Sequence, residues 1–218
     1  MHYFIRLIFF LVFVLTIPSC TKDLATQETV YENDFDKGSL NAIVNGRIDT
    51  YNGSKVLGRY EESGFNLVLS DLPKHDMIRV SFDLYIHDSW NGNAPAPFGP
   101  DIWIMDMDNA NYIYTTFANT NQTDTAGVRQ SFPKTYLPFA GNLPYTNAID
   151  KTLDGVCSLQ GVSGGTAVYR IEKSIYHTQN SFTLGCYGQL EHADASDKKC
   201  DASWSVDNLR VKTVVYKN

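Results

Sequence analysis

The sequence predicts an all-β protein, an antiparallel β-sandwich of about ten short strands. Three observations support this fold class. From Val30 onward the apolar residues alternate with a period of two, which is typical of half-buried strands. The 218 residues include 13 Tyr, 12 Phe and 3 Trp, and aromatic residues among β-branched ones favour strands. No stretch shows a convincing helical period, and a chain of this size can bury one core as a single domain.

The strand candidates follow one another at roughly regular spacing. The first three are weaker in pattern: Val30–Phe35, Ala42–Asp49 and Ser54–Tyr60. A strand–turn–strand unit follows, with turn-forming residues between two apolar runs: Phe65–Ser70, Asp71–Asp76 and Met77–Ile86. A hairpin repeats that design: Ile102–Met107, the turn Asp108–Asn111 and Tyr112–Phe117. The last three strands are predicted at Thr166–Ile175, Ser181–Tyr187 and Ser203–Tyr216.

The segment Ala118–Gly165 interrupts this pattern. It is long and rich in Asn, Gly and Pro, and it carries the aromatic residues Tyr136, Phe139 and Tyr145. The aromatic residues and prolines predict an ordered loop packed over one end or face of the sandwich. Such a loop is either functional or a place where harmless insertions accumulate.

The N-terminus predicts export. Arg6 precedes the nine apolar residues Leu7–Leu15, a run too short to span a bilayer, so residues 1–19 are expected to be a cleaved signal peptide. The sequence Ile17-Pro18-Ser19-Cys20 resembles the lipobox of bacterial lipoproteins. That resemblance implies acylation of Cys20 and, with Thr21 after it, an outer-membrane or cell-surface location. The alternative is an ordinary signal peptide. Residues 20–29 are predicted to be a polar tether, and residues 30–218 the domain.

Charge and cysteine content limit the partners. The chain has 18 Lys+Arg against 24 Asp+Glu, a net charge of −6 without a basic cluster, which argues against nucleic acid. Besides Cys20 there are three cysteines, so one is unpaired within the domain. Cys186 and Cys200 flank a polar excursion and could form a disulfide at its base, which would leave Cys157 over. No CxxC spacing indicates a thiol metal site.

The two ends of the domain carry acidic residues in a recognisable pattern. Glu32 and Asp34 lie in the opening strand, and Asp207 lies in the closing segment Trp204–Val211. This arrangement resembles the jelly-roll sandwiches of carbohydrate-binding modules and concanavalin A-like domains. The resemblance implies a structural calcium held by Glu32, Asp34 and Asp207, since Ca²⁺ prefers carboxylate and carbonyl oxygens. The alternative is that these acids only flank edge strands and face water.

A second pattern covers most of residues 30–211. The segment Phe82–Asn93, then Phe98–Trp103, Thr115–Asn119 and Gln130–Pro133 resemble a recurrent extracellular domain, which implies a fold and an exported location but no activity. A shallow glycan site is predicted on two indole faces with nearby polar groups and two loop tyrosines. Its candidate residues are Trp90, Trp103, Asp88, Asn91, Asn93, Asp101, Tyr136 and Tyr145. The alternative is that both tryptophans pack in the core, as expected for Trp204.

Signals for catalysis are weak. Glycoside hydrolysis needs a pair of carboxylates across a cleft. Only Asp106 and Asp108 are predicted to share one strand face, and no nucleophile elbow or phosphate-binding loop is present. No catalytic residue is therefore named, and an enzyme is less expected than a binding domain. The sequence favours a cell-surface lipoprotein that binds an extracellular glycan. The alternatives are an adhesion module for a surface protein and, less expected, a glycoside hydrolase.

Overall fold

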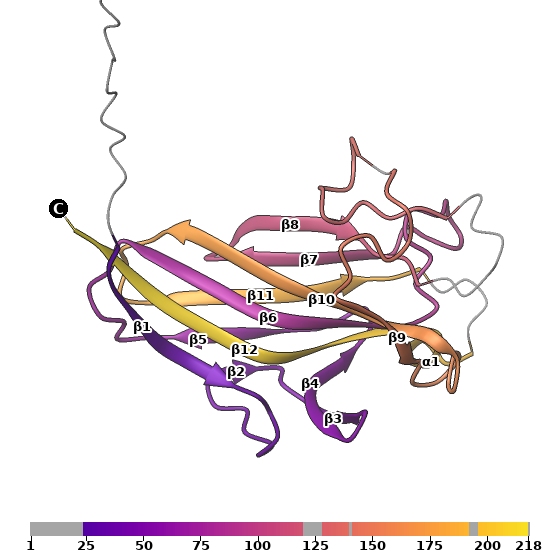
Figure 1. Cartoon of the computed structure of the whole chain (residues 1–218), viewed down its shortest axis with the longest axis horizontal. Helices are drawn as coiled ribbons and strands as arrows, with labels where there is room; N and C mark the ends of the chain where they lie inside the picture. Colours follow the sequence, from indigo (N-terminus) through magenta and orange to yellow (C-terminus); the bar gives the residue numbers. More distant parts are fainter. Residues whose placement is uncertain (1–23, 120–127, 140, 192–195, 218) are drawn as a thin grey trace, which may run out of the picture.

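The computed structural model describes residues 24–119, 128–139, 141–191 and 196–217, which form two packed antiparallel sheets and one short helix, α1 (Lys198–Asp201) (Figure 1). The larger sheet has seven strands. Six of them lie side by side in the order β3 (Ile48–Tyr51), β4 (Ser54–Tyr60), β12 (Ala202–Tyr216), β6 (Met77–Asp88), β10 (Ser163–Tyr176) and β9 (Asp150–Asp154). The seventh, β1 (Leu24–Asn33), pairs with the C-terminal half of β12.

The second sheet has five strands. Their order is β2 (Ile43–Val44), β5 (Gly64–Leu69), β11 (Phe182–Gln189), β7 (Ile102–Met107) and β8 (Ala110–Thr116). Asp108 and Asn109 connect β7 to β8 and both have positive φ, 49° and 63°, as a tight two-residue hairpin turn requires. The predicted hairpin is therefore confirmed, with its turn two residues shorter than expected.

The connections between the sheets define a jelly roll. From β4 to β7 the chain changes sheet at every step; after the β7–β8 hairpin it alternates again through β10, β11 and β12. The late strands insert between early ones, with β12 between β4 and β6 and β11 between β5 and β7. This interleaving of two Greek keys is the jelly-roll arrangement. The predicted all-β antiparallel sandwich is confirmed.

The N-terminal boundary of the domain differs from the prediction. Strand β1 begins at Leu24, inside the predicted tether 20–29, and pairs with β12 from Leu24↔Tyr216 onward. Residues 26–29 are exposed, so this edge strand has no apolar alternation that sequence analysis could detect. The predicted signal peptide and Cys20 lie outside the described residues. Within the described residues, no helix combines the length and apolar character needed to cross a membrane.

The core lies between the two sheets and is rich in aromatic side chains. Trp103 of β7 meets Trp204 of β12 edge to face, with ring centroids 6.0 Å apart. Phe117, directly after β8, packs on Tyr169 of β10 at 4.5 Å. Burial of these large rings from both sheets is the main stabilising term available to such a sandwich. The strand alternation therefore places most of the aromatic residues inside.

Candidate functional site

The predicted tryptophan platform is wrong. Trp90 and Trp103 are both 0 % exposed. The indole N–H of Trp90 donates to the carbonyl of Ser203 at 2.8 Å, which satisfies its polar atom inside the protein. Trp103 occupies an inward-facing position of β7 between Phe82 and Phe117. Neither ring can stack on a sugar at the surface, and Trp204 is also buried, as expected.

Two of the polar residues predicted beside this platform, Asp101 and Asn93, organise loops instead. Asp101 is fully buried, and its carboxylate accepts the backbone N–H groups of Asn91 and Glu191. Burial raises the pKa of Asp101 to about 7. The side-chain oxygen of Asn93 accepts hydroxyl hydrogen bonds from Thr116 and Ser131. These contacts attach the 91–101 loop to the end of β8 and to the segment after residue 128.

Asp88 is a loop organiser as well. Its Oδ1 atom accepts the backbone N–H groups of Val156, Cys157 and Leu159 at 3.0, 3.0 and 3.1 Å. The guanidinium of Arg59 lies 3.8 Å from the other carboxylate oxygen. Asp88 is 0 % exposed, so its charge stabilises a turn of the long loop and is not available to a ligand.

The predicted disulfide is also wrong. Cys200 of α1 pairs with Cys157 in the 155–162 turn, with Cα atoms 5.0 Å apart. Cys186 is free and fully buried. Cys186 is one of the inward-facing residues of β11, which form part of the core. Its sulfur therefore points away from the polar excursion that it flanks in sequence. Burial raises the pKa of the Cys186 thiol.

The three predicted calcium ligands do not form one cluster. Glu32 is paired with Arg210, whose Nε donates to Glu32 at 3.0 Å, and exposed Asp34 accepts the N–H of Asp36. Asp207 has its pKa raised to about 6 by burial and by the neighbouring carboxylates of Asp36, Asp83 and Asp34. Among the described residues, no group of three or more His, Cys, Asp or Glu side chains could hold a metal ion. Glu32 therefore does not fit, and calcium stays a prediction resting on Asp34 and Asp207.

The two loop tyrosines occupy different places. The Tyr145 hydroxyl donates to the carbonyl of Gly164 at 3.0 Å, which ties the loop to the start of β10. Tyr136 donates its backbone N–H to the carbonyl of Tyr114 at 2.7 Å, and their rings lie 6.4 Å apart. The segment around Tyr136 therefore lies along the outer edge of β8. This part of the Ala118–Gly165 loop borders a surface that is lined by Phe132, Lys134 and Thr135 of the same segment.

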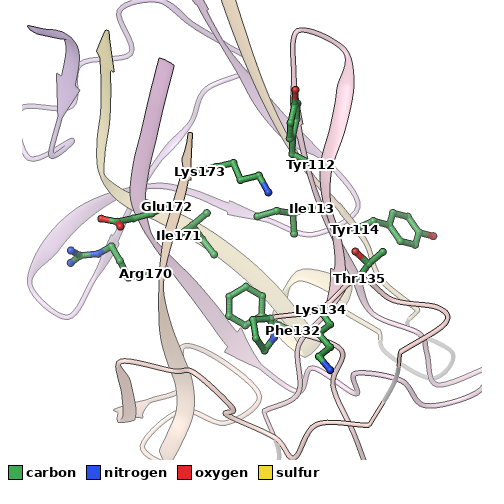
Figure 2. A pocket seen from close by; sticks show the side chains of 11 residues that line it. Tyr112, Ile113, Tyr114, Phe132, Lys134, Thr135, Arg170, Ile171, Glu172 and Lys173 are labelled. Carbon is green, nitrogen blue, oxygen red and sulfur yellow. The ribbon is translucent and has the colours of Figure 1, made fainter. Parts of the chain in front are cut away.

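That surface is a groove between the two sheets. β8 is the outermost strand of the smaller sheet, and β9 covers the edge of β10 only near residues 163–168. Beyond that point the two edges enclose a cavity of about 500 Å³. Its apolar floor consists of Ile113, Phe132 and Ile171, whose side chains point into the space in Figure 2. Small-molecule sites fall in this size range and combine apolar contacts with a few polar groups.

Polar and aromatic groups surround the floor. Lys173 of β10 extends toward β8, and its Nζ lies 5.7 Å from the centre of the Tyr112 ring (Figure 2). Lys134, from the segment after Pro133, places its Nζ 4.1 Å from the centre of the Phe139 ring. Arg170 and Glu172 line the mouth but point to the other side of β10, where Arg170 is bound to Asp83. We call this surface, with its floor, Tyr112, Lys134 and Lys173, the β8–β10 groove.

Of the predicted site residues, Tyr136 lies beside this groove, and none of the predicted residues lines it. One signal could have pointed to it. Along β10 the inward-facing positions are Ile171, Lys173 and Ile175, so a lysine interrupts an apolar series. An inward-facing charge on a strand is unusual unless the strand lies at a sheet edge or beside a polar cavity. Without the strand order, nothing in the sequence paired Lys173 with Tyr112.

No protein-family model and no curated protein matches this chain. Among solved structures it is similar to a family 35 carbohydrate binding module from Clostridium thermocellum, at 10% identity and a TM-score of 0.38, covering 86% of this chain and 98% of that one. It is also similar to the CBM22-2 xylan-binding domain of Paenibacillus barcinonensis Xyn10C, at 12% identity and a TM-score of 0.37, covering 84% and 98%. A third structure, CBM6cm-2 from Cellvibrio mixtus lichenase 5A in complex with cellotriose, gives 11% identity, a TM-score of 0.30 and coverage of 89% and 98%.

Proposed function

We propose that this domain binds an extracellular glycan, without catalysis, in the β8–β10 groove. The observation that carries the proposal is the lining of this cavity of about 500 Å³, which has an apolar floor and a rim of phenol and amine groups. A sugar ring presents C–H groups on its faces and hydroxyl groups on its edges. Tyr112 and Phe132 suit the faces, while Lys134, Lys173 and Thr135 suit the hydroxyl groups.

The positions of the carboxylates around the groove support a binding function rather than glycoside hydrolysis. Glu172 is the single carboxylate among the residues lining the groove, and it points to the far side of β10. Hydrolysis of a glycosidic bond uses two carboxyl groups on either side of the bond. Asp106 is engaged elsewhere, by the side-chain amide of Asn111 at 2.9 Å, and Asp108 accepts the N–H of Thr183.

The proposal includes a location at the cell surface, through a lipid on Cys20. The N-terminal pattern supports export, and the Cys157–Cys200 disulfide is consistent with it, because structural disulfides persist in oxidising compartments. Metabolic labelling with a fatty acid, compared between the native chain and Cys20→Ala, tests the anchor. A lipid retained by the variant would contradict it.

A protein-binding adhesion module remains the second candidate, because β10 has an open edge. Among the described residues, residues 169–176 of β10 pair with β6 on one side and with no strand on the other. An extended segment of a partner could add to such an edge. This candidate predicts binding that is insensitive to the groove side chains but lost when proline replaces an edge residue such as Ser174.

A glycan array probed with the purified processed chain tests the leading proposal. We expect retained glycans whose binding falls at least tenfold in Tyr112→Ala. A matched control is Tyr187→Ala, a half-buried tyrosine on β11 outside the groove. An array without any retained glycan would remove the proposal, and equal losses in both variants would show that the site lies elsewhere.

A further inference from the structure

We propose that the glycan taken by the β8–β10 groove is anionic, carrying carboxylate or sulfate groups that Lys134 and Lys173 recognise. This inference rests on the proposed glycan-binding function and specifies its ligand class. It starts from a contrast of charge. The chain as a whole has a net charge of −6, yet Lys173 extends across the groove and Lys134 lines its rim, with its amine over the Phe139 ring.

Lys173 is the first argument. It occupies an inward-facing position between Ile171 and Ile175 and is half-buried beside the apolar floor. Its amine lies 5.7 Å from the centre of the Tyr112 ring, and among the described residues no carboxylate forms an ion pair with it. An ammonium group beside apolar side chains and without a counter-charge favours an anionic partner. A ligand carboxylate or sulfate placed between β8 and β10 would supply that counter-charge.

Lys134 is the second argument, because its backbone is fixed before any ligand arrives. Its N–H donates to the carbonyl of Ser131 at 2.9 Å, and its own carbonyl accepts the Thr115 hydroxyl at 2.8 Å. The Phe139 ring lies under its ammonium group. The described structure gives this amine no ion pair either. An amine carried on a fixed backbone favours anion binding because less ordering is left to occur on association.

The other ionic groups at the mouth do not cancel these charges. Glu172 and Arg170 extend from the opposite face of β10 (Figure 2). Arg170 is bound to Asp83, and the second oxygen of Asp83 accepts the Asn208 amide at 2.9 Å. The net negative charge of the domain repels a polyanion from the rest of the surface. The two lysines therefore make the groove the favoured place for such a polymer to bind.

A purely structural role for Lys173 makes a different prediction. Inward-facing lysines can protect an open strand edge from pairing with a second molecule. In that case Lys173→Gln would increase self-association and leave glycan binding unchanged. Lys134 lies on a loop rather than on the β10 edge, so edge protection gives no reason for Lys134→Gln to affect binding.

The experiment measures affinities for pairs of glycans that differ in charge alone. Polygalacturonate is compared with its fully methyl-esterified form, and dextran sulfate with neutral dextran, so the two arms separate carboxylate from sulfate recognition. We expect at least tenfold tighter binding of the anionic member in one arm, weakened by salt. Lys134→Gln and Lys173→Gln should each reduce that binding about tenfold, whereas Lys212→Gln on β12 should not. Thermal melting confirms that each variant is folded.

The outcomes separate this inference from the function beneath it. If neutral glycans bind equally well or better, and Tyr112→Ala abolishes that binding, the inference of an anionic ligand is overturned and the glycan site stands. Binding of anionic glycans that both lysine variants retain would overturn the assignment to this groove. No retention of any neutral or anionic glycan would overturn the proposed function and this inference together.

Discussion

Cys157 and Asp88 fix the same turn from two sides, Cys157 through its disulfide to Cys200 and Asp88 through three hydrogen bonds. The disulfide links the 155–162 turn to α1, while Asp88, at the end of β6, accepts three N–H groups from the same turn. Ser89 adds a backbone hydrogen bond from its N–H to the carbonyl of Asp201, at the C-terminal end of α1. The turn is therefore fixed by a covalent bond and by a buried charge, and each can be removed separately.

Removal of the disulfide should destabilise the domain. The bond closes a sequence separation of 43 residues, and a loop of that length corresponds to about 4 kcal/mol in the chain-entropy model. We expect Cys157→Ser/Cys200→Ser, or reduction of the native protein, to lower the free energy of unfolding by about 3–4 kcal/mol in urea titrations. The buried Cys186 should stay unreactive toward thiol reagents until the domain unfolds. An unchanged midpoint after verified reduction would count against this role.

Removal of the Asp88 carboxylate should destabilise the same turn. Asp88→Ala leaves three N–H groups without their acceptor, and each unsatisfied buried donor costs about 1–3 kcal/mol, part of which water can recover. We expect a loss of about 2–4 kcal/mol and faster amide exchange at Val156, Cys157 and Leu159. Asp88→Asn keeps one acceptor oxygen and should lose less. Similar effects of the two variants would contradict the acceptor role.

His87 should make the domain sensitive to acid. Its ring is fully buried between the hydroxyls of Thr166 and Ser205, at 3.0 and 2.7 Å, and this burial lowers its pKa to about 3. Between pH 6.5 and 3.5 the unfolded chain binds a proton that the folded one does not, so stability falls as the pH falls. The loss is about 1.4 kcal/mol per pH unit in that window. Unfolding free energies of the native chain and His87→Gln, measured from pH 7 to pH 4, should therefore converge; parallel curves would show that another group is responsible.

The calcium prediction is tested by chelation. The carboxylate of Asp34 contributes to the raised pKa of Asp207, and a divalent cation between these two carboxylates would relieve their repulsion. A bound cation should give a melting midpoint that rises with added CaCl₂ and falls in EDTA, and Asp207→Asn should remove this response. Glu32→Gln should leave the response intact, because Arg210 already occupies that carboxylate. A midpoint that is the same in EDTA and CaCl₂ would exclude the site.

The strands were predictable because their pattern is local. Alternation and turn residues located β4, β5, β6, β7 and β8 with errors of about two residues or fewer, including the Asp108–Asn109 turn. The strand predicted at Val30–Phe35 covers only the last residues of β1, whose earlier, exposed residues carry no alternation. The single strand predicted at Ala42–Asp49 is wrong, because the structure has two short strands there, β2 and β3, and β9 inside the long loop was missed. Alternation is produced by burying one face, so a strand that buries neither face gives no such signal.

The site was harder to predict because it depends on which strands become neighbours. Trp90 and Trp103 resemble a sugar platform in sequence, and only the sandwich shows that both face the core. Cys186 is nearer to Cys200 in sequence than Cys157 is. Its side chain points from β11 into the core, however, so it does not pair with Cys200. Tyr112 and Lys173 meet because β8 and β10 lie at the same side of two different sheets, a relationship that a single sequence does not contain.

The early start of β1 has a consequence for how the domain would stand on a membrane. Residues 21–23 alone separate Cys20 from the first strand, and three residues span at most about 10 Å. The strand register then aligns Gln27 with Val214, Val214 with Met77 and Met77 with Tyr176, so the anchored end of the sandwich is the end at which β10 finishes. Tyr176, 79% exposed there, would lie near the lipid headgroups. A lipid on Cys20 would thus hold the groove close to the bilayer, with access from the side for polymers that run along the cell surface.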